Sequence, residues 1–239
     1  MSVELLGYKI NDFSFEEAVN YALKLADENK VAQVVTINPE MFATAENNSH
    51  FAQIIDEADM VVPDGIGVKI GLKLNGYNVE RIPGVDLAKE LLMASAENNL
   101  PVAIIGAKEE IIVKAIENLN KEIPNLNITY YHNGYFDNDK QIYDDLKKSD
   151  ARIILVAMGS PRQEEFIYSA KEILSKGLMI GIGGSLDVWS GVIQRAPKIY
   201  QKLGLEWLYR TITQPERIKR IFPAIPLFLL KVLRDKYNL

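Results

Sequence analysis

The sequence contains no cysteine, and its 239 residues include only two histidines. Without cysteine the chain has no disulfide framework, no zinc–thiolate site and no cysteine nucleophile. The histidines, His50 and His132, lie far apart with no companion at metal-ligand spacing, so a histidine-based metal site is not indicated. No apolar run approaches the roughly 20 residues of a membrane span, and the first residues lack the basic start and apolar core of a signal peptide. We therefore expect a cytoplasmic protein.

Two nucleotide-binding motifs are also missing. The segment Gly181-Ile182-Gly183-Gly184 lacks the third glycine of the dinucleotide-binding fingerprint, and no P-loop is present. These absences argue against an NAD-dependent enzyme and against a kinase or ATPase. The chain also lacks repeats and low-complexity segments, and its 48% hydrophobic and 25% charged residues are typical of a globular protein.

What the chain does contain is an alternation of strand and helix patterns. A capping box at Ser14–Glu17 starts a helix, and a β-branched strand follows it. The predicted strands are 32–38, 60–62, 101–106, 127–131, 152–158 and 178–182, and the predicted helices between them are 15–29, 39–47, 66–75, 85–98, 108–122, 139–148 and 161–175. This order predicts an α/β fold, a Rossmann-like and mainly parallel sheet with helices on both faces.

The end of the chain differs from the rest in both pattern and charge. Beyond Trp189 the pattern is helical, and we expect breaks at the four prolines 197, 215, 223 and 226. From Arg195 onward there are ten Lys/Arg and three Asp/Glu, whereas the preceding residues carry 17 basic and 29 acidic groups. We therefore predict a catalytic α/β domain over 1–194 and a helical, basic C-terminal appendage over 195–239, with an anionic partner.

Each inner strand ends in small or polar residues, and one of them is an acid. The strand ends are Thr36-Ile37-Asn38, Asp64-Gly65, Gly106-Ala107, Gly159-Ser160 and Gly183-Gly184-Ser185. In an open parallel sheet the carboxyl ends of the strands meet at one edge, where ligands bind. Glycine there gives ligands access, and helix N-termini favour phosphate. The pattern favours a nucleotide-type ligand, with Asp64 placed either for chemistry or as the N-cap of the next helix.

A second acidic segment, Asp137-Asn138-Asp139, has the spacing with which many sugar-nucleotide enzymes hold a divalent ion. Asp and Asn before a helix are also common turn and cap residues. We favour the turn, and therefore expect no metal site.

The tail combines basic and apolar residues. The helix expected to start at Thr213 places Arg217 and Arg220 on one face. The following stretch, 222–233, is mostly apolar and basic, which suits a helix lying at a membrane interface. A helix packed on the body or on another subunit fits the same pattern, and periodicity does not choose between them.

Several blocks, taken together, closely resemble the WecG/TagA/CpsF glycosyltransferases. The resemblance covers essentially the whole chain and rests on the order of these blocks: Thr-Ile-Asn-Pro-Glu at 36–40, Pro-Asp-Gly-Ile-Gly-Val at 63–68, Arg-Ile-Pro-Gly-Val-Asp at 81–86, Gly-Ser-Pro-Arg-Gln-Glu at 159–164, Gly-Ile-Gly-Gly at 181–184, Arg-Ala-Pro at 195–197 and Gly-Leu-Glu-Trp-Leu-Tyr-Arg at 204–210. With its basic tail the chain is most similar to the family's N-acetylmannosamine transferases of wall teichoic acid linkage-unit synthesis.

The resemblance implies a reaction and a set of site residues. Such enzymes move N-acetylmannosamine from UDP to the 4-hydroxyl of GlcNAc on undecaprenyl diphosphate, with inversion and without a metal or other cofactor. By this resemblance Asp64 is the catalytic base. The substrate pocket would include Thr36, Asn38, Arg81 and Gln163, together with the glycines Gly106, Gly183 and Gly184, and the tail would complete it with Arg210, Arg217 and Arg220.

The expected partners follow from that reaction. They are a UDP-sugar donor, a polyprenyl-diphosphate-linked GlcNAc acceptor and an anionic membrane surface at the inner face of the cell membrane, with self-association through the tail and no nucleic acid. Two alternatives remain open at this point. One is a family member that uses another UDP-sugar, such as a uronic acid or glucose. The other is a non-catalytic UDP-binding module that docks on membranes.

Overall fold

The structure, a computed structural model, describes residues 1–213 and 218–237, including all side chains in these ranges except those of residue 210 and residues 218–223. Its centre is a six-stranded, entirely parallel sheet in the order β4-β3-β8-β7-β5-β6. These strands are β3 (Val31–Ile37), β4 (Met60–Pro63), β5 (Val102–Gly106), β6 (Ile128–His132), β7 (Ile153–Ala157) and β8 (Gly177–Gly181). Five of the six are short runs of mostly β-branched or small apolar residues, as expected for strands covered on both faces.

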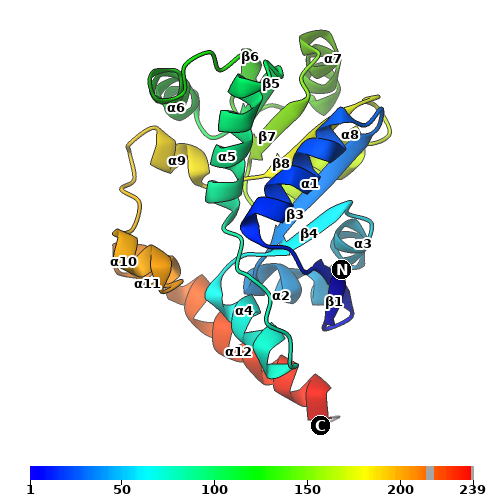
Figure 1. Cartoon of the computed structure of the whole chain (residues 1–239), viewed down its shortest axis with the longest axis vertical. Helices are drawn as coiled ribbons and strands as arrows, with labels where there is room; N and C mark the ends of the chain where they lie inside the picture. Colours follow the sequence, from blue (N-terminus) through cyan, green and yellow to red (C-terminus); the bar gives the residue numbers. More distant parts are fainter. Residues whose placement is uncertain (214–217, 238–239) are drawn as a thin grey trace.

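Helices cover both faces of the sheet, as Figure 1 shows. One face packs against α1 (Phe15–Asp27), α5 (Gly84–Glu97) and α6 (Glu109–Glu122), and the other packs against α7 (Asp139–Ser149) and α8 (Arg162–Ala170). The predicted capping box is present, because Ser14 and Glu17 bond each other's backbone N–H groups. The predicted fold class is therefore confirmed.

Three further helices lie at the β3–β4 end of the sheet. They are α2 (Pro39–Asn47), α3 (Ser49–Asp56) and α4 (Ile66–Leu74), and an antiparallel hairpin of β1 (Ser2–Leu5) and β2 (Tyr8–Asn11) packs on the same cluster of apolar side chains. The sequence patterns did not predict α3 or the hairpin. Both are short elements that complete a core formed mainly by residues distant in sequence.

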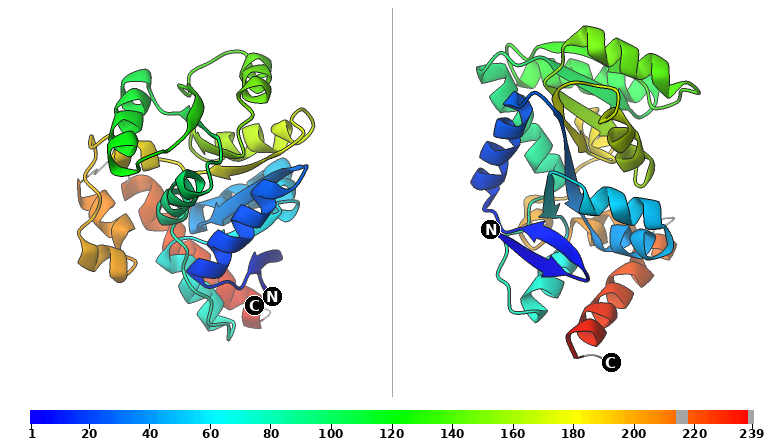
Figure 2. Two further views of the ribbon diagram at one scale, coloured as in Figure 1. Left: turned by 45° about the horizontal axis from the view of Figure 1, so that its top comes forward. Right: turned by 90° about the vertical axis from the view of Figure 1, so that its right-hand side faces the viewer.

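The C-terminal segment contains α9 (Ser185–Trp189), α10 (Lys198–Lys202), α11 (Glu206–Thr213) and α12 (Ile218–Tyr237). Helix α12 lies along α4 and α2, as both views of Figure 2 also show. Phe228 and Val232 are buried in this contact, and the ring of Phe228 lies 4.9 Å from that of Phe42. Leu227 and Leu230 are exposed. One apolar face of α12 therefore packs on the body, and another remains at the surface.

The expected helix breaks at Pro223 and Pro226 are wrong, because α12 continues through both residues. Proline removes a backbone hydrogen bond from a helix interior. Burial of Phe228 and Val232 at the close approach of α12 to Gly71 offsets that loss. Among the helices that the structure describes, none is long and apolar enough to cross a membrane.

Candidate active site

Asp64 follows directly after β4, at the carboxyl edge of the sheet. Its backbone N–H donates to the carbonyl of Ile37 at the end of the neighbouring strand, over 2.8 Å. Gly65 then takes a positive φ of 83°, a conformation that glycine adopts without steric cost, and α4 begins at the next residue. Gly65 is the N-cap of α4 and no side chain caps that helix, so the interpretation of Asp64 as its cap is wrong.

The Asp64 carboxylate instead contacts a different helix. Its Oδ2 accepts a hydrogen bond of 3.2 Å from the backbone N–H of Gly84, the first residue of α5. Burial raises the pKa of the Asp64 carboxyl above its usual range. The Gly84 N–H and the Arg81 guanidinium act in the opposite direction and lower that pKa. The result is a fixed carboxyl that holds its proton more strongly than an exposed aspartate does.

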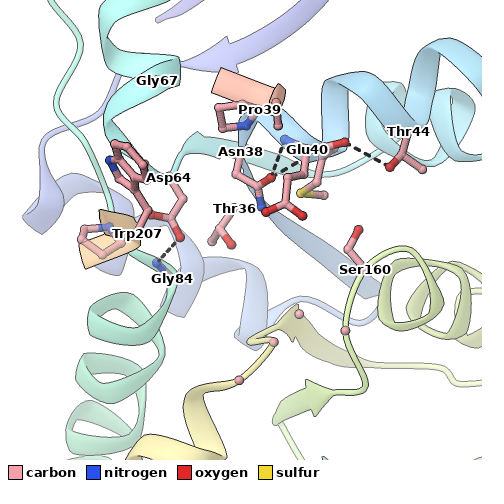
Figure 3. A pocket seen from close by; sticks show the side chains of 18 of the residues that line it. Thr36, Asn38, Pro39, Glu40, Thr44, Asp64, Gly67, Gly84, Ser160 and Trp207 are labelled. Carbon is pink, nitrogen blue, oxygen red and sulfur yellow. Dashed lines mark hydrogen bonds between the residues drawn. The ribbon is translucent and has the colours of Figure 1, made fainter. Parts of the chain in front are cut away.

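Asp64 lines a pocket of about 850 Å³ that opens at the carboxyl edge of the sheet. Figure 3 shows Asp64 beside Trp207, with Thr36 and Asn38 next to them and Ser160 across the pocket. The structure brings seven of the predicted site residues together in the wall of this pocket: Thr36, Asn38, Asp64, Arg81, Gln163, Gly183 and Gly184.

Two of these residues are fixed by local structure. The side-chain oxygen of Asn38 accepts from the backbone N–H groups of Glu40 and Met41, at 3.0 and 3.2 Å, and so caps α2. Thr36 packs against Gly84, where an added Cβ would lie only 2.8 Å from the threonine hydroxyl oxygen. The glycine at position 84 therefore keeps the threonine and the N-terminus of α5 in contact.

Arg81 belongs to a network of charges that joins the body to the segment after residue 194. Its Nη2 donates to the carbonyl of Gln201 at 2.8 Å, and its Nη1 lies 3.9 Å from Oε2 of Glu206. Arg195 bonds both oxygens of Asp86, at 2.6 and 2.8 Å, and also donates to Glu206 at 3.0 Å. These partly buried pairs hold the start of the predicted appendage against the α5 side of the pocket.

Gln163 lies on the opposite wall, in the first turn of α8, and is buried. Its side-chain oxygen accepts from the backbone N–H of Gly183 at 3.0 Å, and its amide nitrogen donates to Glu164 at 2.7 Å. The glycine turn after β8 is thereby attached to the start of α8.

The remaining predicted site residues lie elsewhere or are not described. Gly106, at the end of β5, is not among the residues that line the pocket. An added Cβ there would lie 2.3 Å from the carbonyl oxygen of Ala157, so this glycine allows a close backbone approach. Arg217 lies outside the described residues. Arg210 and Arg220 have a described backbone in α11 and α12, but their side chains are outside the description.

The pocket wall also includes Ser160, Glu206 and Trp207, which were not among the predicted site residues, although Ser160 belongs to one of the polar strand ends noted in the sequence. Glu206 and Trp207 lie within the 204–210 block on which the family resemblance rests, so a signal was present. The indole N–H of Trp207 is buried and has no hydrogen-bond partner among the described residues.

The candidate metal residues do not converge. Asn138 is the N-cap of α7, which agrees with the turn favoured for Asp137–Asp139. His50 packs edge-on against Tyr168, and His132 against Phe136. Within residues 1–213 and 218–237, no group of three or more His, Asp or Glu side chains is placed to hold a metal ion.

A parallel sheet with a pocket at its carboxyl edge, lined by glycine turns, acidic side chains and an arginine, is the place where proteins of this architecture bind small-molecule ligands. The chain belongs to the WecG/TagA/CpsF family of glycosyl transferases, whose family model matches residues 3–239. This confirms the resemblance inferred from the sequence blocks.

Two curated relatives are similar over most of their length, and both carry the name N-acetylglucosaminyldiphosphoundecaprenol N-acetyl-beta-D-mannosaminyltransferase. The protein from Bacillus spizizenii is 35% identical over 211 residues, which cover 88% of this chain and 82% of the relative. The protein from Bacillus subtilis strain 168 is 33% identical over 222 residues, covering 92% and 86%.

Proposed function

We propose that the protein transfers N-acetylmannosamine from a UDP donor to GlcNAc carried on undecaprenyl diphosphate, in wall teichoic acid synthesis. The family membership and the names of the two relatives support this activity. The structural observation that carries the proposal is the placement of Asp64: a carboxyl held by the Gly84 N–H in the wall of a pocket of about 850 Å³.

In the proposed reaction the 4-hydroxyl oxygen of the acceptor forms a bond to the anomeric carbon of the donor sugar. The bond from that carbon to the UDP oxygen breaks, and Asp64 takes the hydroxyl proton. Attack from the face opposite UDP inverts the anomeric configuration. A base of raised pKa accepts a proton more readily than an ordinary carboxylate, provided that it is ionised at the working pH.

The leaving UDP gains negative charge, which positive groups must stabilise. Arg81 is the described cation in the pocket wall. We propose that Arg210, Arg217 and Arg220 add to it, and that the reaction needs no metal ion. We also propose that the basic tail docks on an anionic membrane, where the acceptor resides, and that its exposed apolar residues Leu227 and Leu230 contribute to this docking or to self-association.

The test is acceptor-dependent release of UDP from UDP-N-acetylmannosamine, measured in EDTA with a lipid-diphosphate GlcNAc acceptor. Wild type should release UDP, and Asp64→Asn should lose this activity while binding UDP. A panel with UDP-glucose and UDP-sugar acids tests the donor. A folded wild type that binds UDP but is inert with every donor would refute the transferase proposal.

A further inference from the structure

Three polar side chains form a buried cluster behind the Gln163 wall of the pocket. Gln33, in the middle of β3, is 0% exposed, and Gln163 and Glu164 at the start of α8 are 6% and 3% exposed. Polar groups at such depth are costly unless they are hydrogen-bonded. Three glutamine or glutamate side chains in one buried place therefore call for a structural reason.

The hydrogen bonds of the cluster converge on Glu164, one set from the pocket wall and one from β3. Oε1 of Glu164 accepts from Nε2 of Gln163 at 2.7 Å, and Oε1 of Gln163 accepts from the backbone N–H of Gly183 at 3.0 Å. The amide nitrogen of Gln33 donates to the backbone carbonyl of Glu164 at 3.1 Å. Glu164 itself does not line the pocket, whereas Gln163 and Gly183 do.

The carboxyl of Glu164 determines which way the Gln163 amide faces. An amide group has a donor end and an acceptor end, and a carboxylate oxygen only accepts. If the Gln163 amide were reversed, its oxygen would face the Glu164 oxygen and its NH₂ would face the Gly183 N–H. Both contacts would then be repulsive, so the acceptor at Glu164 selects the orientation that fixes the glycine turn.

The neighbouring strand leaves room for this pair. At Gly181 in β8, an added Cβ would lie 2.4 Å from Nε2 of Gln163 and 3.0 Å from Oε1 of Glu164. The missing side chain at position 181 therefore allows the amide and the carboxyl to lie against the sheet. Strand β8, helix α8 and the glycine turn after β8 therefore meet at the hydrogen-bonded pair of Gln163 and Glu164.

We propose that Glu164 is a positioning residue: it orients the Gln163 amide, which in turn holds the Gly183–Gly184 turn in the shape that binds the nucleotide part of the donor. This inference rests on the proposed function for the identity of the ligand. It assigns Glu164 an effect on donor binding, exerted through Gln163, with little effect on the chemical step.

A conservative variant is available for the test. Burial raises the pKa of Glu164 to about 7, and a protonated carboxyl still keeps one oxygen that only accepts, which is the role of Oε1 toward Gln163. Glu164→Gln keeps an acceptor oxygen and the size of the side chain. Glu164→Leu removes the acceptor oxygen. Glu164→Asp shortens the side chain by one methylene and so moves the acceptor oxygen away from the Gln163 amide.

The experiment measures the Kd of UDP by calorimetry and, separately, KM and kcat for transfer. Loss of one hydrogen bond predicts a rise of about three- to tenfold in Kd and KM for Glu164→Leu and Glu164→Asp, with kcat within about twofold. Glu164→Gln should stay within about twofold of wild type. Glu165→Leu, one residue along α8 and absent from the pocket wall, is the matched control and should bind UDP as wild type does.

A double-mutant cycle separates positioning from general loss of structure. In a Gln163→Ala background, Glu164→Asp should weaken UDP binding no further, because the group through which it acts is gone. Unchanged Kd in both Glu164→Leu and Glu164→Asp, or an equal loss in the Gln163→Ala background, would overturn the proposal. Should Glu164→Leu not fold, Glu164→Asp decides alone. A wild type that binds UDP without transfer would refute the proposed reaction but leave this binding test intact.

Discussion

The two walls of the pocket hold their functional side chains by different forces. On the Asp64 side, Arg81, Asp86, Arg195 and Glu206 form a network of ion pairs whose side chains are 13 to 37% exposed. On the Gln163 side, the cluster is at most 6% exposed and is joined by single hydrogen bonds between amide, carboxyl and backbone groups. We call the first, whose side chains are partly exposed, the charged wall, and the second, whose side chains are almost fully buried, the dry wall.

The difference follows from where each wall lies in the fold. The dry wall joins α8 to the neighbouring central strands β3 and β8. The charged wall joins α5 to a segment more than a hundred residues later, through partly buried ion pairs. Ion pairs tolerate residual water, whereas a buried amide pair needs its geometry fixed by packing. We therefore expect the two walls to respond differently to substitution, salt and pH.

The largest effect should come from the acid on the charged wall. Asp64→Asn removes the proposed base but keeps its size, so kcat should fall by about 10²- to 10⁴-fold, the usual contribution of general base catalysis. The Kd of UDP should change little. The measurement is steady-state transfer together with calorimetric UDP binding. A variant that retains more than a tenth of wild-type kcat would show that another group takes the proton.

The next effect concerns the stability of the charged wall. Arg195→Leu leaves Asp86 and Glu206 without their shared cation, and we expect the free energy of unfolding to fall by about 2 kcal/mol. A fully buried network would lose more, but these side chains are partly exposed. Urea unfolding at low and high NaCl measures the loss, which should be smaller in high salt.

The matched control breaks an exposed pair. Lys148 is 76% exposed and contacts Asp145 one turn away, so Lys148→Leu should cost less than about 0.5 kcal/mol. Equal losses for the two variants would mean that the Arg195 network does not fasten the later segment to the body.

Much of this architecture was predictable from local patterns. The strand and helix alternation is a property of short segments, and the predicted bounds of the six sheet strands differ from the observed ones by at most one residue at either end. The position of Asp64 at a sheet edge followed from one apolar run and two glycines. The hairpin β1–β2 and the continuous helix α12 were not predicted, since each is stabilised by contacts with residues far away in sequence.

The site was predictable only in part for the same reason. The residues that resemble the family blocks include the pocket-lining Thr36, Asn38 and Gln163. The sequence did not indicate that Gln33 reaches α8, or that Arg195 pairs with Asp86, because such contacts depend on the packed arrangement of distant elements. Glu164 was visible in a motif, but the positioning role that we propose for it rests on a hydrogen bond that the sequence does not show.

The pH dependence of transfer tests the electrostatics of the charged wall. The base must be ionised, so kcat/KM should fall as the pH drops through the pKa of Asp64. Burial places this acid limb above the usual value of about 4 for aspartate. Arg81 lowers the same pKa, so Arg81→Gln should move the limb to higher pH. An unchanged limb in this variant, measured as a pH profile of kcat/KM, would show that Arg81 does not act on Asp64.

The smallest effect should come from the dry wall, at Gln33, a member of its cluster that does not line the pocket. Gln33→Leu replaces a buried amide, whose oxygen has no partner among the described residues, with an apolar side chain of similar size. The lost bond to the Glu164 carbonyl and the removal of an unpaired polar group oppose each other, so the free energy of unfolding should change by less than about 1 kcal/mol. The change should not depend on NaCl, and the Kd of UDP should stay near the wild-type value, because Gln33 bonds the backbone rather than Gln163. A clear loss of UDP binding would mean that β3 also determines the shape of the glycine turn.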